Sequence, residues 1–112
     1  VIFEFQPDPA QTSEYFDVAA ELRPLLEDRD GFISIERFES VTSPGRFVSL
    51  SFWRDEEAVQ AWRNVEEHRV AQRKGRDGLF QDYRLRVASV LRDYTLSNHE
   101  AAPDDSIAFH DK

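Results

Sequence analysis

Three residues of this 112-residue chain have side chains that could do chemistry together in an enclosed site: Trp62, His68 and Arg86. A buried indole N–H is a donor that needs a partner. An imidazole can act as a general base near neutral pH or as an axial ligand to iron. A guanidinium can orient an anionic or phenolate group. We therefore predict Trp62 as pocket wall and donor, His68 as base and Arg86 as stabiliser of an anion.

Each of the three also has a structural alternative. Trp62 stands at helical spacing among apolar residues, where a large side chain packs a helix onto a sheet. His68 lies in a charged run that is typical of a helix face turned to water. Arg86 could form a structural ion pair with Glu4 or Glu36 between two sheets.

Composition and charge exclude several classes of function. The net charge of −8 repels phosphate backbones and anionic membrane surfaces, so we expect neither nucleic acid nor a membrane as partner. The chain has no cysteine, which removes disulfide and thiol chemistry. No apolar run approaches the ~20 residues of a membrane helix, and no leader is visible, so we expect a cytoplasmic protein. His99 and His110 share no metal-ligand spacing with His68, and we predict no metal site.

Alternation of apolar and polar residues predicts strands over 1–6, 32–39, 46–53 and 83–96. Helical spacing predicts two helices, one starting near Thr12 and one capped by Asp55. Pro24 should kink or end the first helix. The order β-α-β-β-α-β is that of the ferredoxin-like, split βαβ class of α+β domain. We place this domain at 1–96, followed by a polar, acidic and flexible tail at 97–112.

The predicted sheet has one face that the helices cover and one that needs another partner. We expect the second face to mix large aromatic and small polar side chains from the two middle strands: Phe32, Ser34, Glu36, Phe38, Phe47, Ser49, Ser51 and Trp53. Such a patch is unusually large for a monomer, which indicates a homodimer with these faces packed together. The alternative is an amphipathic sheet with a few tolerated surface aromatics.

The stretches GFISIERFES, PGRFVSLSFWRDEEAVQAWRNVEEHRVAQRKGR and DYRLRVASVLRDY resemble the antibiotic biosynthesis monooxygenase domains, in their heme-degrading-monooxygenase-like branch. The resemblance covers about residues 1–96. It implies a dimeric α+β barrel made by two ferredoxin-like sheets face to face. It also implies one of two activities, which are cofactor-free oxidation of polycyclic aromatic compounds by molecular oxygen, or opening of the heme ring.

The positions that the resemblance implies match only in part. Trp62 stands where the family has its helix tryptophan. The histidine of the heme-degrading group falls on Gln72, with His68 about one turn earlier, and the first strand lacks that group's asparagine. The asparagine of the cofactor-free group falls on Ala58. We therefore expect no cofactor, with heme possible but disfavoured.

Together these features predict a small monooxygenase that oxidises an aromatic or apolar small molecule with molecular oxygen. Its pocket should lie between the helices and the sheet, with a volume of about 300–1,000 Å³. Beside Trp62, we predict that its walls include Phe5, Phe52, Gln72 and Phe80. The alternative is a non-catalytic dimer that binds a small ligand or serves as an accessory domain.

Overall fold

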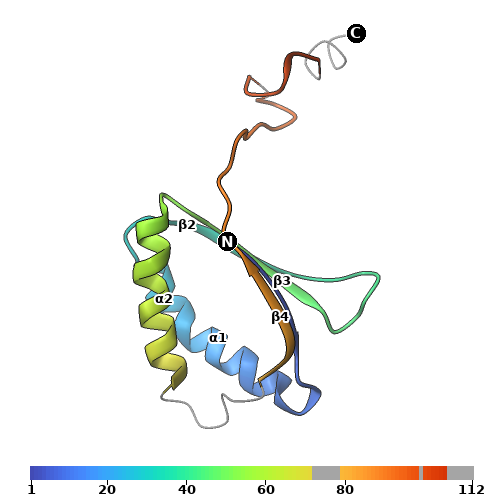
Figure 1. The fold of residues 1–112 in the computed structure, drawn as a ribbon, viewed down its shortest axis with the longest axis vertical. Helices are drawn as coiled ribbons and strands as arrows, with labels where there is room; N and C mark the ends of the chain where they lie inside the picture. The colour runs from blue at the N-terminus through green and yellow to red at the C-terminus, as the bar shows by residue number, and fades with distance from the viewer. Residues whose placement is uncertain (72–78, 99, 106–112) are drawn as a thin grey trace.

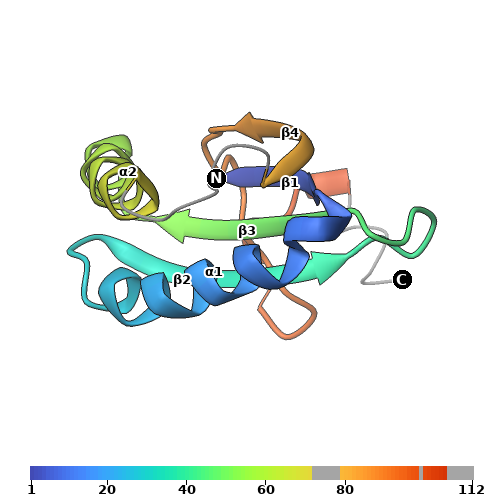
Figure 2. The same ribbon diagram turned by 90° about the horizontal axis from the view of Figure 1, so that it is seen from below.

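The computed structural model describes residues 1–71, 79–98 and 100–105, without the side chains of 67–71. Its elements follow the order β1 (Ile2–Pro7), η1 (Pro9–Gln11), α1 (Thr12–Glu27), β2 (Phe32–Glu39), β3 (Phe47–Trp53), α2 (Glu56–Ala71) and β4 (Phe80–Arg86). The strands form one antiparallel sheet in the order β2-β3-β1-β4, with both helices on one side of it (Figures 1 and 2). This is the predicted ferredoxin-like α+β fold. None of the helices in the described part is long and apolar enough to cross a bilayer.

An aromatic core joins the sheet to α1. Phe5 of β1 is completely buried. Its ring stacks on Phe3 at 4.9 Å between centroids and on Phe47 of β3 at 5.7 Å. Tyr15 of α1 covers it from the helix side at 4.7 Å, and Phe80 of β4 meets it edge-on at 5.7 Å. Aromatic pairs at these separations add to the stability that area burial alone provides.

In β3, the side that faces the helices is the opposite of the one predicted. Phe47 packs against Phe16 of α1 at 5.5 Å, and Trp53 stacks near Trp62 of α2 at 6.5 Å, so this side faces the helices. The outward side carries apolar residues instead: Val48, Leu50 and Phe52. Alternation along a strand separates its two sides but does not say which side the helices cover. Here the helices cover the aromatic one.

The second strand keeps its predicted side over most of its length. Ser34, Glu36 and Phe38 pair in register with the outward residues of β3. A bulge between Phe32 and Ser34 breaks the alternation, because one extra residue reverses the side from which the next side chain projects. The Phe32 ring therefore lies 5.3 Å from that of Trp53 on the helix side, which corrects its predicted outward position.

The fourth strand is shorter than predicted at its C-terminal end. It ends at Arg86, which pairs with Ile2, the first paired residue of β1. Residues 87–96 lie beyond this ladder, and within the described chain they have no neighbouring strand to pair with. They leave the body of the domain (Figure 1), and their large apolar side chains, such as Leu91 and Leu96, are exposed. By contrast, α1 continues past Pro24 to Glu27, so the proline does not end it.

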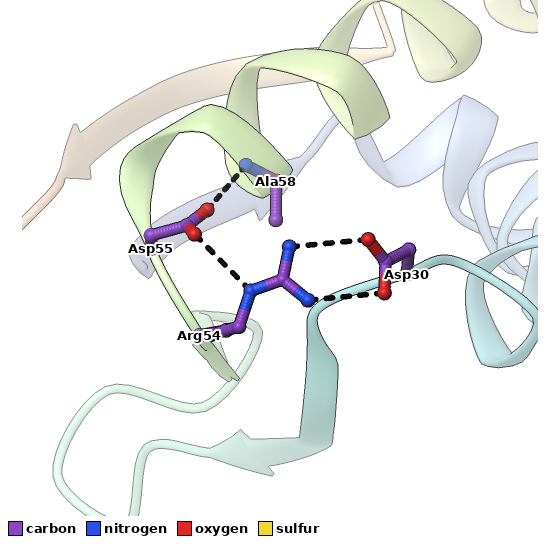
Figure 3. A network of polar contacts seen from close by, with 4 residues as sticks. All are labelled: Asp30, Arg54, Asp55 and Ala58. Atoms are coloured by element: carbon purple, nitrogen blue, oxygen red, sulfur yellow. Dashed lines mark hydrogen bonds and ion pairs between the residues drawn. The ribbon is translucent and has the colours of Figure 1, made fainter.

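Polar contacts around Arg54 fix the start of α2 (Figure 3). Arg54 donates to both carboxylate oxygens of Asp30 at 3.0 and 3.1 Å, and to Oδ2 of Asp55 at 3.1 Å. Oδ1 of Asp55 accepts a hydrogen bond from the N–H of Ala58 at 2.9 Å, which is the predicted helix cap. The turn before β2 is thereby tied to the first turn of α2.

The same contacts lower the pKa values of both carboxyl groups. The hydrogen bond from Arg54 is the main cause for Asp30, and the hydrogen bond from the Ala58 N–H is the main cause for Asp55. Because the native pKa values lie below the ordinary value of 3.8, the network stabilises the fold above that pH. This contribution is lost as the pH falls through the native pKa values. The groups are exposed, so water and salt weaken the ion pairs.

The turn before β2 approaches α2 so closely that only glycine fits. Gly31 has a φ of 85°, and a Cβ added there would lie 2.6 Å from the Cβ of Ala58. The Gly31 carbonyl accepts a hydrogen bond from the N–H of Arg54 at 2.7 Å. Trp62 follows Ala58 by about one helical turn. The contact at Gly31 therefore also determines where Trp62 lies.

Replacing Gly31 with alanine should lower the free energy of unfolding by about 2–5 kcal/mol. The left-handed backbone costs roughly 1–2 kcal/mol with a side chain, and overpacking against Ala58 adds about 1–3 kcal/mol. Gly45→Ala is the matched control, because Gly45 has a φ of 92° but nothing lies within 4 Å of its added Cβ. Gly45→Ala should lower the free energy of unfolding only by the cost of the left-handed backbone. Chemical denaturation measures both, and equal losses would mean that the contact with Ala58 carries no weight.

Candidate functional site

A cleft of about 880 Å³ lies between the helices and the sheet, within the predicted size range. Its walls are mainly apolar and come from α1, α2 and the helix-facing side of the sheet. Val18, Leu22 and Leu26 line it from α1, and Trp62 lines it from α2 as predicted. Small-molecule sites are typically concave, apolar and of this volume.

The two tryptophans of the cleft differ in their hydrogen bonds. Trp53 donates its indole N–H to Oγ of Ser51 at 2.9 Å. The hydrogen bonds among the described residues include none from the indole of Trp62, whose residue is 8% exposed. No buried polar side-chain atom in the described part lacks a partner. The Trp62 N–H is therefore not sealed inside the core, and Trp62 lines the cleft, so its N–H is available to donate to a molecule that enters.

The four other predicted wall residues have different positions. Phe80 lines the cleft. Phe5 is buried behind the cleft surface, in the aromatic core. Phe52 points to the outward face, where it pairs with Ser34, because the helices cover the opposite side of β3 from the one predicted. Gln72 lies outside the described residues.

The structure does not bring Arg86 to Trp62. Arg86 pairs in register with Ile2 on the outward face, and its Nη1 lies 3.3 Å from Oε2 of Glu4. The sequence left an ion pair between two sheets as an alternative, but this pair joins neighbouring strands of one sheet. The sheet separates it from the cleft. His68 lies on α2, but its side chain is outside the described part. Its role as base stays a prediction.

Sequence reasoning missed several polar residues of the cleft, among them Tyr15 and Arg37. Arg37 pairs in register with Ser49 on the helix-facing side of β2. Its Cζ lies 5.6 Å from the ring centroid of Tyr15. Burial raises the pKa of Tyr15, the charge of Arg37 and a hydrogen bond from its guanidinium oppose this shift, and the Glu66 charge adds to it more weakly. The Tyr15 hydroxyl therefore stays protonated at neutral pH and can donate a hydrogen bond.

The described walls of the cleft do not fit a heme iron or a metal ion. The described part contains no cluster of three or more His, Asp or Glu side chains that could hold a metal. Among the described residues that line the cleft, the two possible axial ligands of a heme iron are Tyr15 and Tyr83. Iron binds tyrosine as the phenolate, and the raised pKa of Tyr15 opposes that form. Tyr83 is 62% exposed and so does not offer an enclosed ligand.

Residues 1–74 match the protein family described as antibiotic biosynthesis monooxygenase. A jasmonate monooxygenase ABM of Pyricularia oryzae is 50% identical over 90 residues, which are 80% of this chain and 42% of that protein. The chain thus spans less than half of that relative's length. The uncharacterised protein YqjZ of Bacillus subtilis is 33% identical over 78 residues, which are 70% of this chain and 67% of that protein.

A solved structure shows the same fold. MhuD, a heme-degrader from Mycobacterium tuberculosis whose structure has two hemes bound in its active site, matches with a TM-score of 0.62. The match covers 85% of this chain and 100% of the other at 18% identity. At this identity the likeness concerns the fold alone.

The hydrogen bonds of the two tryptophans predict different costs for two similar substitutions. Trp53→Phe leaves the Ser51 hydroxyl without its donor, whereas Trp62→Phe removes an N–H that has no described protein partner. Trp53→Phe should therefore lower the free energy of unfolding by about 1 kcal/mol more than Trp62→Phe. Chemical denaturation measures both. In a Ser51→Ala background this difference should disappear, and its persistence would contradict the assignment.

Proposed function

Because the chain belongs to the antibiotic biosynthesis monooxygenase family, we propose that it is a monooxygenase that takes a small apolar molecule into the cleft between helices and sheet. The observation that carries the proposal is the mainly apolar cleft of about 880 Å³, which Trp62 lines. The relative named as a jasmonate monooxygenase supports a small apolar substrate. Jasmonate is accordingly the first compound to test.

The proposed roles of the residues follow from their positions. The apolar walls exclude water from the substrate, which strengthens every electrostatic interaction in the cleft. The Trp62 N–H donates to an oxygen atom of the substrate or of an oxygen intermediate. His68 remains the proposed base. Arg86, paired with Glu4 across the sheet, has no part in the proposed site.

We propose that the reaction uses no resident cofactor. The poor fit of Tyr15 and Tyr83 to heme iron supports this. A substrate CH2 group that loses a proton to form a stabilised anion can itself reduce molecular oxygen. The carbon forms a bond to one oxygen atom, its second C–H bond and the O–O bond then break, and the CH2 group becomes a carbonyl group as the other oxygen atom leaves as water. The substrate supplies all four electrons. The protein needs only to bind the substrate, remove the proton and stabilise the anion.

A second candidate function is ligand binding without catalysis. The specific observation in its favour is the composition of the described walls of the cleft, which include no histidine. Arg86, the other polar group expected to assist catalysis, faces away from the cleft. Oxygen consumption separates the two functions, since a binding protein takes up the ligand without consuming oxygen.

We propose that the outward face of the sheet packs against a second copy of this chain. The helices leave this face uncovered, and its phenylalanines Phe38 and Phe52 are 44% and 40% exposed. An apolar sheet face needs a cover. The face also carries charges of both signs, such as Glu4 and Arg86, although the chain has a net charge of −8. A face with both signs can be complementary to its own copy.

Filling the cleft should abolish turnover. Ala19 lines the cleft, whereas Ala20, the next residue of α1, is exposed. With jasmonate or a hydroxyanthracene as substrate, Ala19→Phe should lower kcat/KM by at least about tenfold. Ala20→Phe should leave it within about twofold of the wild type. An oxygen electrode measures the rate of oxygen consumption, and mass spectrometry identifies the product.

The same assay tests the absence of a cofactor. The protein should consume oxygen in the presence of substrate without added hemin. When one equivalent of hemin is added to the protein, the Soret absorption band should show no sharp shift. Uptake that depends on hemin contradicts the cofactor-free reaction. Tight binding of a substrate without oxygen uptake, in either condition, supports the ligand-binding alternative.

Assembly through the outward face predicts which substitutions weaken the dimer. Phe52→Asp should destabilise it by about 3–5 kcal/mol, the cost of an uncompensated buried charge. Val41→Asp is the control, because Val41 is 95% exposed outside the strands. Sedimentation at ~10 μM measures the assembly, a concentration at which a complex with Kd near 1 μM is mostly associated. A wild-type monomer under these conditions, or an equal effect of both variants, contradicts the proposed interface.

A further inference from the structure

We propose that Arg37 binds the carboxylate of the substrate, so that the cleft selects small apolar acids over neutral molecules of the same shape. The proposal rests on the proposed function, because it assigns a substrate class to the same cleft. Its basis is an arginine at the edge of an apolar cleft that forms no ion pair with any described side chain.

The described part shows no carboxylate partner for Arg37 or for Arg63, which also lines the cleft, whereas it shows one for several other arginines. Four of them pair with carboxylates at 2.8 to 3.7 Å: Arg23 with Glu27, Arg46 with Asp82, Arg54 with Asp30 and Asp55, and Arg86 with Glu4. The chain carries 22 acidic and 14 basic residues, so carboxylates are abundant. An arginine that faces a cleft and makes no such pair has its donors available for a ligand.

The surroundings of Arg37 hold its guanidinium in place. Its Cζ lies 5.6 Å from the ring centroid of Tyr15 and 5.3 Å from that of Phe16. Aromatic rings at this distance attract a cation. Arg37 also donates a hydrogen bond to the Tyr15 hydroxyl. A guanidinium has five N–H groups, so others remain that can form paired hydrogen bonds to a planar carboxylate. The protonated Tyr15 hydroxyl adds a donor at the same place.

The other charged residues that line the cleft are Arg23, Arg63, Glu66 and Asp82. Arg23 and Asp82 are paired with Glu27 and Arg46, whereas Arg63 of α2 adds a second positive charge. Glu66 lines it too and has interactions of its own. Its effect on the pKa of Tyr15 is weaker than that of Arg37, so the positive charge dominates at that hydroxyl. A carboxylate held there leaves the rest of the ligand to the apolar walls.

The test compares an acid with its neutral isostere. Isothermal titration calorimetry of 1-naphthylacetate and 1-naphthylacetamide measures the preference of the wild-type protein. The acid should bind about 10–100-fold more tightly, the usual contribution of hydrogen bonds to a charged group. Arg37→Gln should abolish this preference by weakening the acid alone. Arg37→Lys should retain part of it, because the charge remains without the planar fork.

Two controls make the result decisive. Arg92→Gln removes an exposed arginine that lies outside the cleft and should keep the wild-type preference. Ala19→Phe should abolish binding of both probes, which shows that they occupy the cleft. Equal binding of the two probes to the wild-type protein overturns the role of Arg37 but leaves the cleft as a binding site. Binding of neither probe overturns the proposed function as well. A loss in Arg37→Gln that is equal for both probes shows a structural role and also overturns the inference.

Discussion

The close approach of the turn before β2 to the first turn of α2 sets the depth at which α2 lies against the sheet. It depends on the missing side chain of Gly31, since a Cβ there would collide with Ala58. The ion pairs of Arg54 tie the same two segments together from outside, but they are exposed and correspondingly weak. Backbone packing therefore positions the helix, and the charges orient its first turn. Because Trp62 follows by about one turn, its distance from Trp53, and with it one end of the cleft, depends on this contact.

The strand order could be predicted because it depends on local patterns that this chain displays clearly. Four alternating stretches, two helical repeats and a cap at Asp55 are each local signals. The side of each strand that meets the helices is a tertiary property, and alternation does not contain it. Phe47 and Trp53 meet aromatic rings on the helices, which is why they point inward. The end of β4 is also tertiary, because it depends on where β1 stops offering a partner to Arg86.

The candidate site shows the same division. Trp62 could be found from sequence because large apolar residues at helical spacing face a core or a pocket. Arg86 and Phe52 were misplaced because their sides of the sheet depend on the register between strands. Arg37 could have been found, since it continues the side of its strand that carries Ile35, and a charge on an apolar side is a signal of function. The sequence offers no signal for a polar role of Tyr15, and only its position beside Arg37 reveals one.

The donors of the cleft fall into two groups, and the difference limits what the cleft can bind. The indole of Trp53 is satisfied by Ser51 within the protein. The indole of Trp62 has no such acceptor among the described residues, and the guanidinium of Arg37 donates to the Tyr15 hydroxyl but has no carboxylate partner there. Polar groups beside apolar surface are normally paired, so further acceptors for these two must come from water or from a ligand. The cleft therefore offers hydrogen-bond donors without acceptors and a positive charge. It suits a molecule with an apolar body and oxygen atoms at its polar end. On the outward face, Glu4 and Arg86 satisfy one another within the chain, so that face is suited to packing rather than to binding a small molecule.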